Sequence, residues 1–349
     1  MAQSARLSRG VTTPVAAGVL GVAFCLSALI ALGTGPVPIA PLDVLSALIG
    51  QAALVQHEIV IHHLRLPRAL LAVSVGASLA VSGAALQGLF RNPLADPALV
   101  GVSSGAVLGA VSVIVLGSTV LTVFSTLFAA WAVPVAAFIG ALTVTAIIYR
   151  LAQSEYGTHV TTLLLAGIAI NAIAMAGVGL LTFIADDNQL RTLTFWNLGS
   201  LGGATWQGLA VALPLVWLPL LWLMRQADAL NALALGEAEA GHLGFDTRQL
   251  KRRIVVCVAL SVGCATGLTG LIGFVGLLLP HLVRLALGPD HRTLLPCAAV
   301  GGATLMLLAD SAARTVAQPA ELPIGIITAL LGGPVFLWLL VRQKMSGAI

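Results

Sequence analysis

The side chains that could carry out chemistry in this sequence are its carboxylates, histidines and cysteines. Only 13 aspartates and glutamates occur in 349 residues, and the centres of the long apolar stretches are almost free of them. A carrier driven by protons or sodium ions usually needs carboxylates at mid-membrane, because these groups exchange the proton or bind the ion. An ion-coupled secondary carrier is therefore a disfavoured alternative. The carboxylates near the apolar stretches lie in loops or at stretch ends: Asp43, Glu58, Asp96, Asp186, Asp187, Asp310 and Glu321.

Motifs for hydrolytic chemistry are missing from the sequence. No GxxxxGK[ST] phosphate loop occurs, so the chain is not expected to hydrolyse ATP itself. An intramembrane enzyme would need a nucleophile–base pair or a metal cluster, but His281 has no HExxH or GxSxG motif to join. The cysteines at 25, 257, 264 and 297 have no metal-binding spacing. We predict a chain that is not an enzyme and has no metal or permanent cofactor. If it moves a substrate uphill, the energy comes from another subunit.

The elements that must position these side chains are membrane helices. Apolar residues make up 58% of the chain, charged residues only 9%, and the mean hydropathy is +1.02. In a soluble protein about a quarter of the residues are charged. We therefore predict an all-α polytopic membrane protein in which residues 1–349 form one transmembrane domain. A span takes about 20 apolar residues, and ten are predicted: 14–33, 69–89, 97–117, 130–150, 160–184, 207–224, 253–268, 272–287, 294–310 and 324–341.

The placement of lysine and arginine predicts the orientation of these spans. With the N-terminus in the cytoplasm, ten spans put 13 of the 17 basic residues on the cytoplasmic side. This excess agrees with the positive-inside rule. We therefore expect a multi-pass membrane protein with both termini cytoplasmic and no nucleic-acid partner. The basic residues left outside are Arg65, Arg68, Arg191 and Arg314.

Small residues recur at every fourth position in the second and third predicted spans. Such stripes let helix backbones approach closely in lipid, where no hydrophobic drive brings helices together. We therefore expect tight helix crossings at these positions. The stripes consist of Gly76, Ala80, Ala84 and Gly88, and of Gly101, Gly105 and Gly109.

The segment 226–252 is the longest predicted cytoplasmic loop. Its helix-forming residues, with Gly241 and Gly244 as breaks, predict two short helices at the membrane face. Two leucines, Leu233 and Leu235, come just before a Gly-Glu pair in an otherwise polar segment. This pattern suits a helix seated in the groove of a partner, and a solvated connector is the alternative.

Five stretches of sequence follow one another along the chain with long, specific motifs. They are LRLPRALLAVSVGASLAVSGAALQGLFRNPLADPALVGVSSGA (64–106), LALGEAEAGHLGF (233–245), GLIGFVGLLLPHLVRL (270–285), DHRTLLP (290–296) and AELPIGIITALLGGPVFLWLL (320–340). Together they resemble permease subunits of the iron-chelate and vitamin B12 class of ATP-binding-cassette (ABC) importers. The resemblance implies a type II ABC importer permease architecture. It also implies ten spans per subunit, a homodimer, two cytoplasmic ATP-binding subunits and a periplasmic substrate-binding protein. The location that it implies is the bacterial cytoplasmic (inner) membrane.

The same resemblance suggests roles for two groups of residues. Arginine suits bidentate recognition of carboxylates, and Arg65, Arg68 and Arg314 resemble the arginines that dock acidic residues of the binding protein. Simple anchoring at the membrane interface is the alternative. The cytoplasmic segment resembles the element that couples the permease to the ATPase. Its residues are Leu233, Leu235, Gly236, Glu237 (the central one), Ala240, Gly241, Leu243 and Gly244.

The stretch DNQLRTLTFWNLGSLGG (187–203) resembles heme-importing permeases more than the B12 or ferric-siderophore branches. Heme carries two propionates and a large apolar ring, which an arginine and aromatic side chains would suit. Arg191, Phe195 and Trp196 are the candidate substrate contacts, and a structural turn is the alternative. Loop histidines are weaker candidates as heme-iron ligands, because a permease must release its cargo: His57, His62 and His63.

The sequence thus predicts the permease subunit of an ATP-driven importer that carries heme across the cytoplasmic membrane by alternating access. The first alternative is the same machine carrying a ferric siderophore or cobalamin. The second is an ion-coupled secondary carrier.

Overall fold

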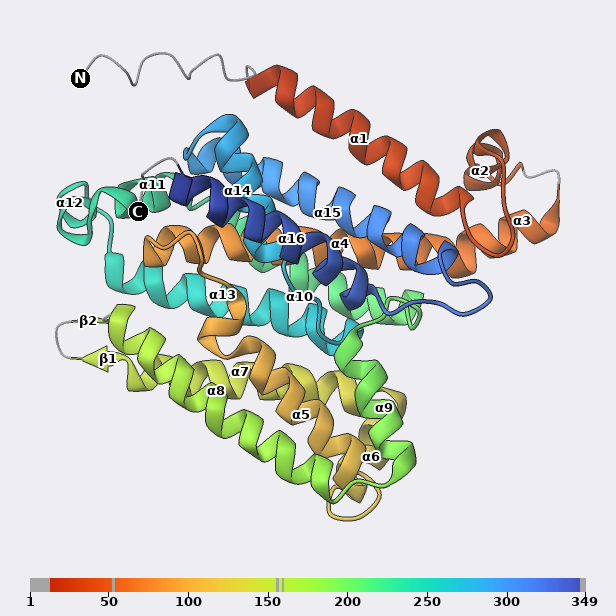
Figure 1. Ribbon diagram of the computed structural model, residues 1–349, viewed down its shortest axis with the longest axis horizontal. Helices are drawn as coiled ribbons and strands as arrows, with labels where there is room; N and C mark the ends of the chain where they lie inside the picture. Colours follow the sequence, from red (N-terminus) through yellow and green to blue (C-terminus); the bar gives the residue numbers. More distant parts are fainter. Residues whose placement is uncertain (1–12, 52–53, 155–156, 159, 346–349) are drawn as a thin grey trace.

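The long helices of the structure form where the sequence is continuously apolar (Figure 1). The computed structural model describes residues 13–51, 54–154, 157–158 and 160–345. In this part of the chain, ten helices match the ten predicted spans, so the all-α prediction is confirmed. They are α1 (Thr13–Gly33), α4 (Leu66–Phe90), α5 (Val102–Leu116), α7 (Ala132–Leu151), α8 (Val160–Phe183), α10 (Trp206–Met224), α13 (Thr247–Thr269), α14 (Val275–Leu287), α15 (His291–Thr315) and α16 (Ile324–Met345).

Shorter elements connect these helices. A π-helical turn (Val60–Arg65) leads directly into α4, and 3-10 turns (Pro97–Val100 and Ala129–Trp131) precede α5 and α7. The only strands in the described residues form a hairpin of β1 (Gln153–Ser154) and β2 (Gly157–Thr158). The connecting α-helices are α2 (Pro41–Leu48), α3 (Val55–Ile59), α6 (Thr122–Phe128), α9 (Asp187–Leu198), α11 (Ala227–Leu235) and α12 (Glu237–His242).

Length and composition separate the helices into two groups. Among the described residues, seven helical stretches are long and apolar enough to cross a membrane, and α5, α14 and the first part of α16 are shorter apolar helices. The separation of α13 from α14 confirms the predicted break near Gly270, whose φ of +72° is a conformation that glycine adopts readily. The stretch GLTGLIG therefore ends one helix before the next begins.

Helix α4 lies at the centre of the bundle. Every residue from Ser74 to Phe90 is buried, and the helix contacts α10, α13, α14 and α15. Hydroxyl groups fasten it to its neighbours: Ser78 lies 2.8 Å from the hydroxyl of Ser261 on α13. The indole of Trp217 on α10 donates to Ser74 at 3.0 Å. Buried polar groups in a membrane bundle need such partners, because no water reaches them.

The predicted stripes of small residues are sites where helices cross. A side chain at Gly76 of α4 would overlap the backbone carbonyl of Gly302 on α15. Likewise, a side chain at Gly105 of α5 would overlap the carbonyl of Gly140 on α7. The close crossings expected from the sequence are thus confirmed, and both sides of each contact are glycine.

Helices at the margins of the bundle present apolar side chains outward. In Figure 1, α1 runs along one edge and α8 along the opposite edge, with α4, α13 and α15 between them. Val19 and Val22 of α1 are exposed, as are Ile168 and Ile173 of α8. Exposed apolar surface of this extent needs lipid or another protein chain to cover it.

Candidate functional site

Two of the predicted docking arginines cap the end of α1. Arg65, at the end of the π-helical turn, donates to the carbonyl of Leu32 at 2.6 Å and also to that of Val37. Arg314, near the end of α15, donates to the carbonyl of Ala31 at 2.8 Å. The last carbonyls of a helix lack partners within it. These guanidinium groups therefore tie the end of α1 to α4 and α15.

A buried carboxylate joins the third arginine to this cluster. The Oδ1 atom of Asp310 lies 2.9 Å from Nη2 of Arg68, and its Oδ2 atom lies 3.1 Å from Nε of Arg314. Arg68 also pairs with Glu321, at 2.9 Å between Nη1 and Oε2. Asp310 is only 2% exposed, and burying a carboxylate costs little only when cations and hydrogen bonds compensate it. Two guanidinium groups provide that compensation here.

All three predicted docking arginines line one cavity of about 300 Å³, which we call the arginine cavity. Its lining residues are Pro36, Val37, Val60, Leu64, Arg65, Arg68, Gly202, Ala204, Arg314 and Glu321. Arg65 and Arg314 are each only 5% exposed, because their N–H groups bind carbonyls of the same chain. The sequence suggested no such task for these side chains, and it gave Asp310 and Glu321 no role. Docking through these arginines stays a prediction.

The three candidate substrate contacts lie on α9 but do not share one face. Arg191 and Phe195, one turn apart, are exposed, whereas Trp196 is half-buried and packs beside Leu271. Asp186 begins α9 through a capping box: its side chain accepts from the backbone N–H of Gln189, whose own side chain accepts from the backbone N–H of Asp186. The helix is therefore firmly placed, with one exposed cationic and aromatic pair.

The three histidines predicted in a loop lie in α3 and the π-helical turn instead. His57 and His62 each lie near a polar group of α2, whereas His63 is exposed. The Nε2 atom of His62 lies 2.9 Å from the carbonyl of Ala47, so this nitrogen carries the proton. The Nδ1 atom of His57 lies 4.0 Å from a carboxylate oxygen of Asp43. Throughout the described ranges, no cluster of three or more His, Cys, Asp or Glu side chains could hold a metal ion.

The predicted coupling segment folds as two short helices, α11 and α12. The break between them is Gly236, whose φ is +140°, whereas Gly241, predicted as a break, lies inside α12. The chain already breaks at Gly236, whose positive φ ends α11, so Gly241 lies within the second helix as an ordinary helical residue. Gly244, with φ of +89°, follows the second helix and is a break as predicted.

The eight predicted coupling residues fall into a buried and an exposed set. Leu233 is only 2% exposed and packs into the core of its own chain, whereas Leu235 is 69% exposed. Glu237 pairs with Lys251 on α13, at 2.5 Å between Oε2 and Nζ. The inward side chains place the helices, and the outward ones are available to a partner. Gly236 and Ala240 join Leu233 in the buried set, while Leu235, Glu237, Gly241, Leu243 and Gly244 are exposed.

A polar contact set links α11 to the start of α15, and we call it the α11–α15 latch. The Asn231 side chain donates to the carboxylate of Asp290 at 2.7 Å and accepts from the backbone N–H of His291 at 3.0 Å. Asp228 pairs with Arg292 at 2.5 Å. The backbone N–H of Arg292, followed by the amide of Asn231, holds the pKa of Asp290 below its usual value. The sequence singled out DHRTLLP but did not predict its partner on α11.

His291 has a defined tautomer within this latch. Its Nδ1 atom lies 2.8 Å from Oδ1 of Asn231, which can only accept, so Nδ1 carries the proton. The Nε2 atom is buried without a hydrogen-bond partner and packs against Gly88 of α4. The imidazole thus fills the gap among α11, α15 and α4.

A family model described as the FecCD transport family matches residues 22–342, which is most of the chain and includes all or part of each of the ten helices. The chain belongs to the FecCD transport family. FecCD members are permease subunits of ABC transporters, so the resemblance noted in the sequence is confirmed, and this chain is a membrane permease.

Individual members of the FecCD family resemble the chain over most of its length. It is 51% identical over 284 residues to the hemin transport system permease protein HmuU of Yersinia pestis, covering 81% of this chain and 83% of that protein. It is 41% identical over 324 residues to the vitamin B12 import system permease protein BtuC of Salmonella typhimurium, covering 93% and 94%.

A solved structure agrees with the fold of this FecCD permease. It is an inward-facing conformation of a metal-chelate type ABC transporter, with a TM-score of 0.81 and 32% sequence identity. The match covers 95% of this chain and 100% of the other. The predicted ABC importer permease architecture is thereby confirmed.

Proposed function

We propose that this chain is the permease subunit of an ATP-driven importer that carries heme across the cytoplasmic membrane by alternating access. The observation that carries the proposal is the 51% identity to a hemin permease, against 41% to B12 permeases. The stretch 187–203, with its exposed Arg191 and Phe195, favours the same substrate. Carriage of cobalamin or a ferric siderophore by the same machine is the competing proposal.

The proposed importer contains two copies of this chain, two cytoplasmic ATP-binding subunits and a periplasmic substrate-binding protein. Positive charge gathers at the end of the bundle that holds α11, α12 and the beginning of α13 (Figure 1). By the positive-inside rule we propose that this end faces the cytoplasm, together with the beginning of α1 and the end of α16 (Figure 1). The charged residues concerned are Arg225, Arg248, Lys251, Arg252 and Arg253.

The ATP-binding subunit would bind the exposed side of α11 and α12. Leu235 and Leu243 are both largely exposed and would enter a groove of the partner, as helix-in-groove contacts require. Glu237 would bind beside them, since its carboxylate is half-exposed although it pairs with Lys251. The buried Leu233 would transmit force into the bundle.

Helix α15 is the proposed connection between the ATPase and the opposite face. It begins at the α11–α15 latch and ends at Arg314, which binds the end of α1. At 1.5 Å per residue, its 25 residues span about 37 Å, more than the ~30 Å hydrocarbon core of a bilayer. A displacement of α11 would therefore reach the arginine cavity through a single helix.

The arginine cavity is the proposed docking site for the binding protein. A carboxylate of that protein would replace Glu321, which is 43% exposed, as a partner of Arg68. Arg65 and Arg314 would support this contact by holding α1 in place. Arg191 and Phe195 are the proposed contacts for a heme propionate and the heme ring during passage.

The test is ATP hydrolysis by the reconstituted importer in vesicles. We expect the heme-loaded binding protein to stimulate hydrolysis more than siderophore-loaded or B12-loaded binding proteins, and we expect heme uptake to need ATP. Stronger stimulation by the B12-loaded or siderophore-loaded protein would replace heme with that cargo. Uptake that survives ATP depletion but collapses with an ionophore would establish an ion-coupled carrier instead.

A further inference from the structure

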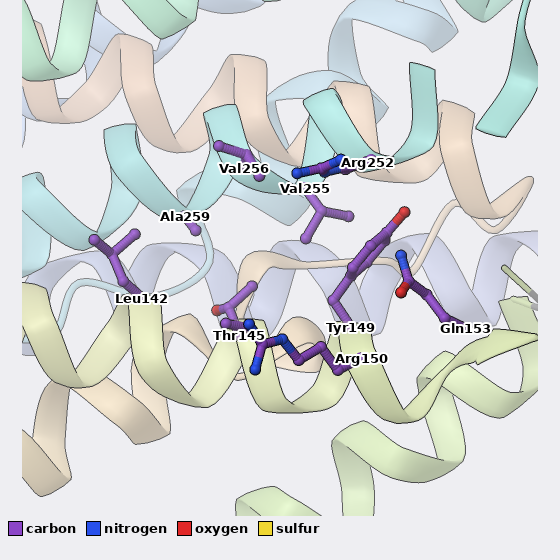
Figure 2. Close-up of a pocket in the computed structure, with 10 residues that line it drawn as sticks. Leu142, Thr145, Tyr149, Arg150, Gln153, Arg252, Val255, Val256 and Ala259 are labelled. Atoms are coloured by element: carbon purple, nitrogen blue, oxygen red, sulfur yellow. The ribbon is translucent and has the colours of Figure 1, made fainter. Parts of the chain in front are cut away.

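A groove between α7 and α13 contains none of the residues proposed for docking, coupling or substrate contact (Figure 2). Its volume is about 460 Å³, and its walls are mainly apolar, with Leu142 on α7 and Val255, Val256 and Ala259 on α13. Val256 is itself half-exposed. A groove of this composition on the side of a membrane bundle suits a hydrocarbon chain.

Arginines border the groove at its charged end. Figure 2 shows Arg150 on α7 and Arg252 on α13 at opposite sides, with Thr145 on the α7 wall. Both arginines are exposed, and neither pairs with a carboxylate within the described part of the chain. Two guanidinium groups that line one groove, neither of them paired with a carboxylate of the described residues, form a site for an anion. Arginine binds phosphate through two parallel hydrogen bonds.

A second groove adjoins the first on the other side of α13. Its volume is about 580 Å³, and Trp222, Arg253, Arg252 and Val256 are among its lining residues. Arg252 and Val256 therefore belong to both grooves. The arrangement offers one cationic end and two neighbouring apolar channels along the same helix.

The wall of the first groove also holds a polar group without a partner. The Oγ1 atom of Thr145 is buried, the residue being 3% exposed, and makes no hydrogen bond. Buried polar groups are nearly always paired, so this hydroxyl indicates an absent ligand atom. Thr145 lies five residues before Arg150, or about 7.5 Å along the helix. Its hydroxyl is therefore farther from the charged end of the groove and closer to the apolar part.

We propose that these grooves bind an anionic phospholipid of the cytoplasmic leaflet. Its phosphate lies between Arg150 and Arg252, an ester carbonyl accepts a hydrogen bond from Thr145, and its acyl chains lie along α13 on both sides of Val256. Basic pockets between membrane helices on the cytoplasmic side bind anionic lipid headgroups in this way. The assignment to this leaflet rests on the proposed orientation, whereas binding itself does not depend on heme or on ATP.

The amphiphilic layout decides the class of ligand. A soluble phosphate compound would use the arginines but leave the apolar walls uncovered, and a second copy of the chain would have to bring carboxylates to two exposed cations. A lipid satisfies the charge and the apolar walls together. Lys251, beside Arg252, pairs with Glu237 of α12, so the bound lipid also adjoins the proposed coupling segment.

Native mass spectrometry of the full-length chain titrated with dioleoyl phosphatidylglycerol tests the proposal. We expect R150Q/R252Q to weaken retention about thirty-fold, from ~1 kcal/mol for each arginine at 1.4 kcal/mol per factor of ten. The matched control R225Q/R248Q removes two cytoplasmic arginines outside both grooves and should change retention less than twofold. Dioleoyl phosphatidylcholine should be retained at least tenfold less well by the unaltered chain. Equal losses in the two double variants would overturn the proposal.

A second variant separates a lipid from other occupants. Val256→Trp keeps both arginines and fills the apolar part, so it should lower phosphatidylglycerol retention at least tenfold while the protein elutes as the unaltered chain does. Glycerol 3-phosphate that competes as well as phosphatidylglycerol would assign the site to a soluble anion. A Val256→Trp chain that loses its self-association but retains the lipid would assign the groove to a second copy.

Discussion

Replacing Asp310 with asparagine tests the buried charge cluster at the end of α15. The substitution keeps the size of the side chain but removes the charge that lies between Arg68 and Arg314. Breaking a buried ion pair costs about 3–5 kcal/mol, because a buried charge is left uncompensated. The lower end applies here, since Arg68 keeps Glu321 and Arg314 keeps carbonyl partners on α1.

The expected result is a drop of ~3 kcal/mol in the free energy of unfolding, which lowers Tm by about 4 °C for a chain of this length, at ~2.1 cal/mol/K of unfolding entropy per residue. Thermal unfolding of the purified permease in detergent measures it. Glu321→Gln is the matched control: Glu321 is 43% exposed and, among the described residues, its ion pair is with Arg68 alone. Such an exposed pair contributes ~0–1 kcal/mol. Equal shifts for the two variants would refute the argument that burial sets the cost.

A double variant sharpens this test. If Asp310 and Arg68 stabilise each other directly, Arg68→Gln should cost less in the Asp310→Asn background than alone. Contacting residues couple by about 0.5–3 kcal/mol. Strictly additive effects would mean that the two side chains act on stability separately, despite the 2.9 Å between them.

Three further predictions concern helix packing, coupling and pH. Gly105→Ala should destabilise the fold by about 1–3 kcal/mol through overpacking against α7, whereas Gly179→Ala, with nothing within 4 Å of the new methyl group, should not lower Tm. Asn231→Ala should open the α11–α15 latch, so that the reconstituted importer hydrolyses more ATP per heme imported; an unchanged ratio would contradict that role. Because Asp290 has a lowered pKa in the fold, its stabilising effect is present above the unfolded value of about 3.9 and is lost as pH falls through the folded value. Tm between pH 5 and pH 3 should therefore depend less on pH in Asp290→Asn.

The sequence predicted the ten membrane helices well, because a continuous apolar stretch of sufficient length indicates a segment that can lie in the hydrocarbon core of a bilayer. It also predicted close crossings at Gly76 and Gly105, since only a missing side chain lets two backbones touch. The end of the first coupling helix was placed wrongly, at Gly241 instead of Gly236. Several glycines in one stretch carry the same propensity, and tertiary packing decides which of them adopts a positive φ.

The site could be predicted only in its residue types. Arg65, Arg68 and Arg314 were recognised as a group, but their partners lie up to 283 positions away in the sequence, and no local pattern reports such distances. Asn231 gave no signal on its own, because its role exists only once α11 meets α15. The placement of Arg150 and Arg252 on opposite sides of one groove likewise follows from the packing of α7 on α13.

The glycine crossings divide the permease into a stiff part and a compliant part. Helix α4 meets α15 at Gly76 and Gly302, and meets α14 at Gly83 and Gly276, in each case with backbone against backbone. Sliding or rotation at either crossing would force carbonyl groups into one another, so these three helices must travel as a block. Helix α8 has only 22% of its apolar window buried, and its close backbone contact, at Gly167, is with Leu99 of a 3-10 turn and not with another long helix. Spin labels on α8 and on the block should therefore report a changing separation during the transport cycle, whereas two labels within the block should keep a constant one.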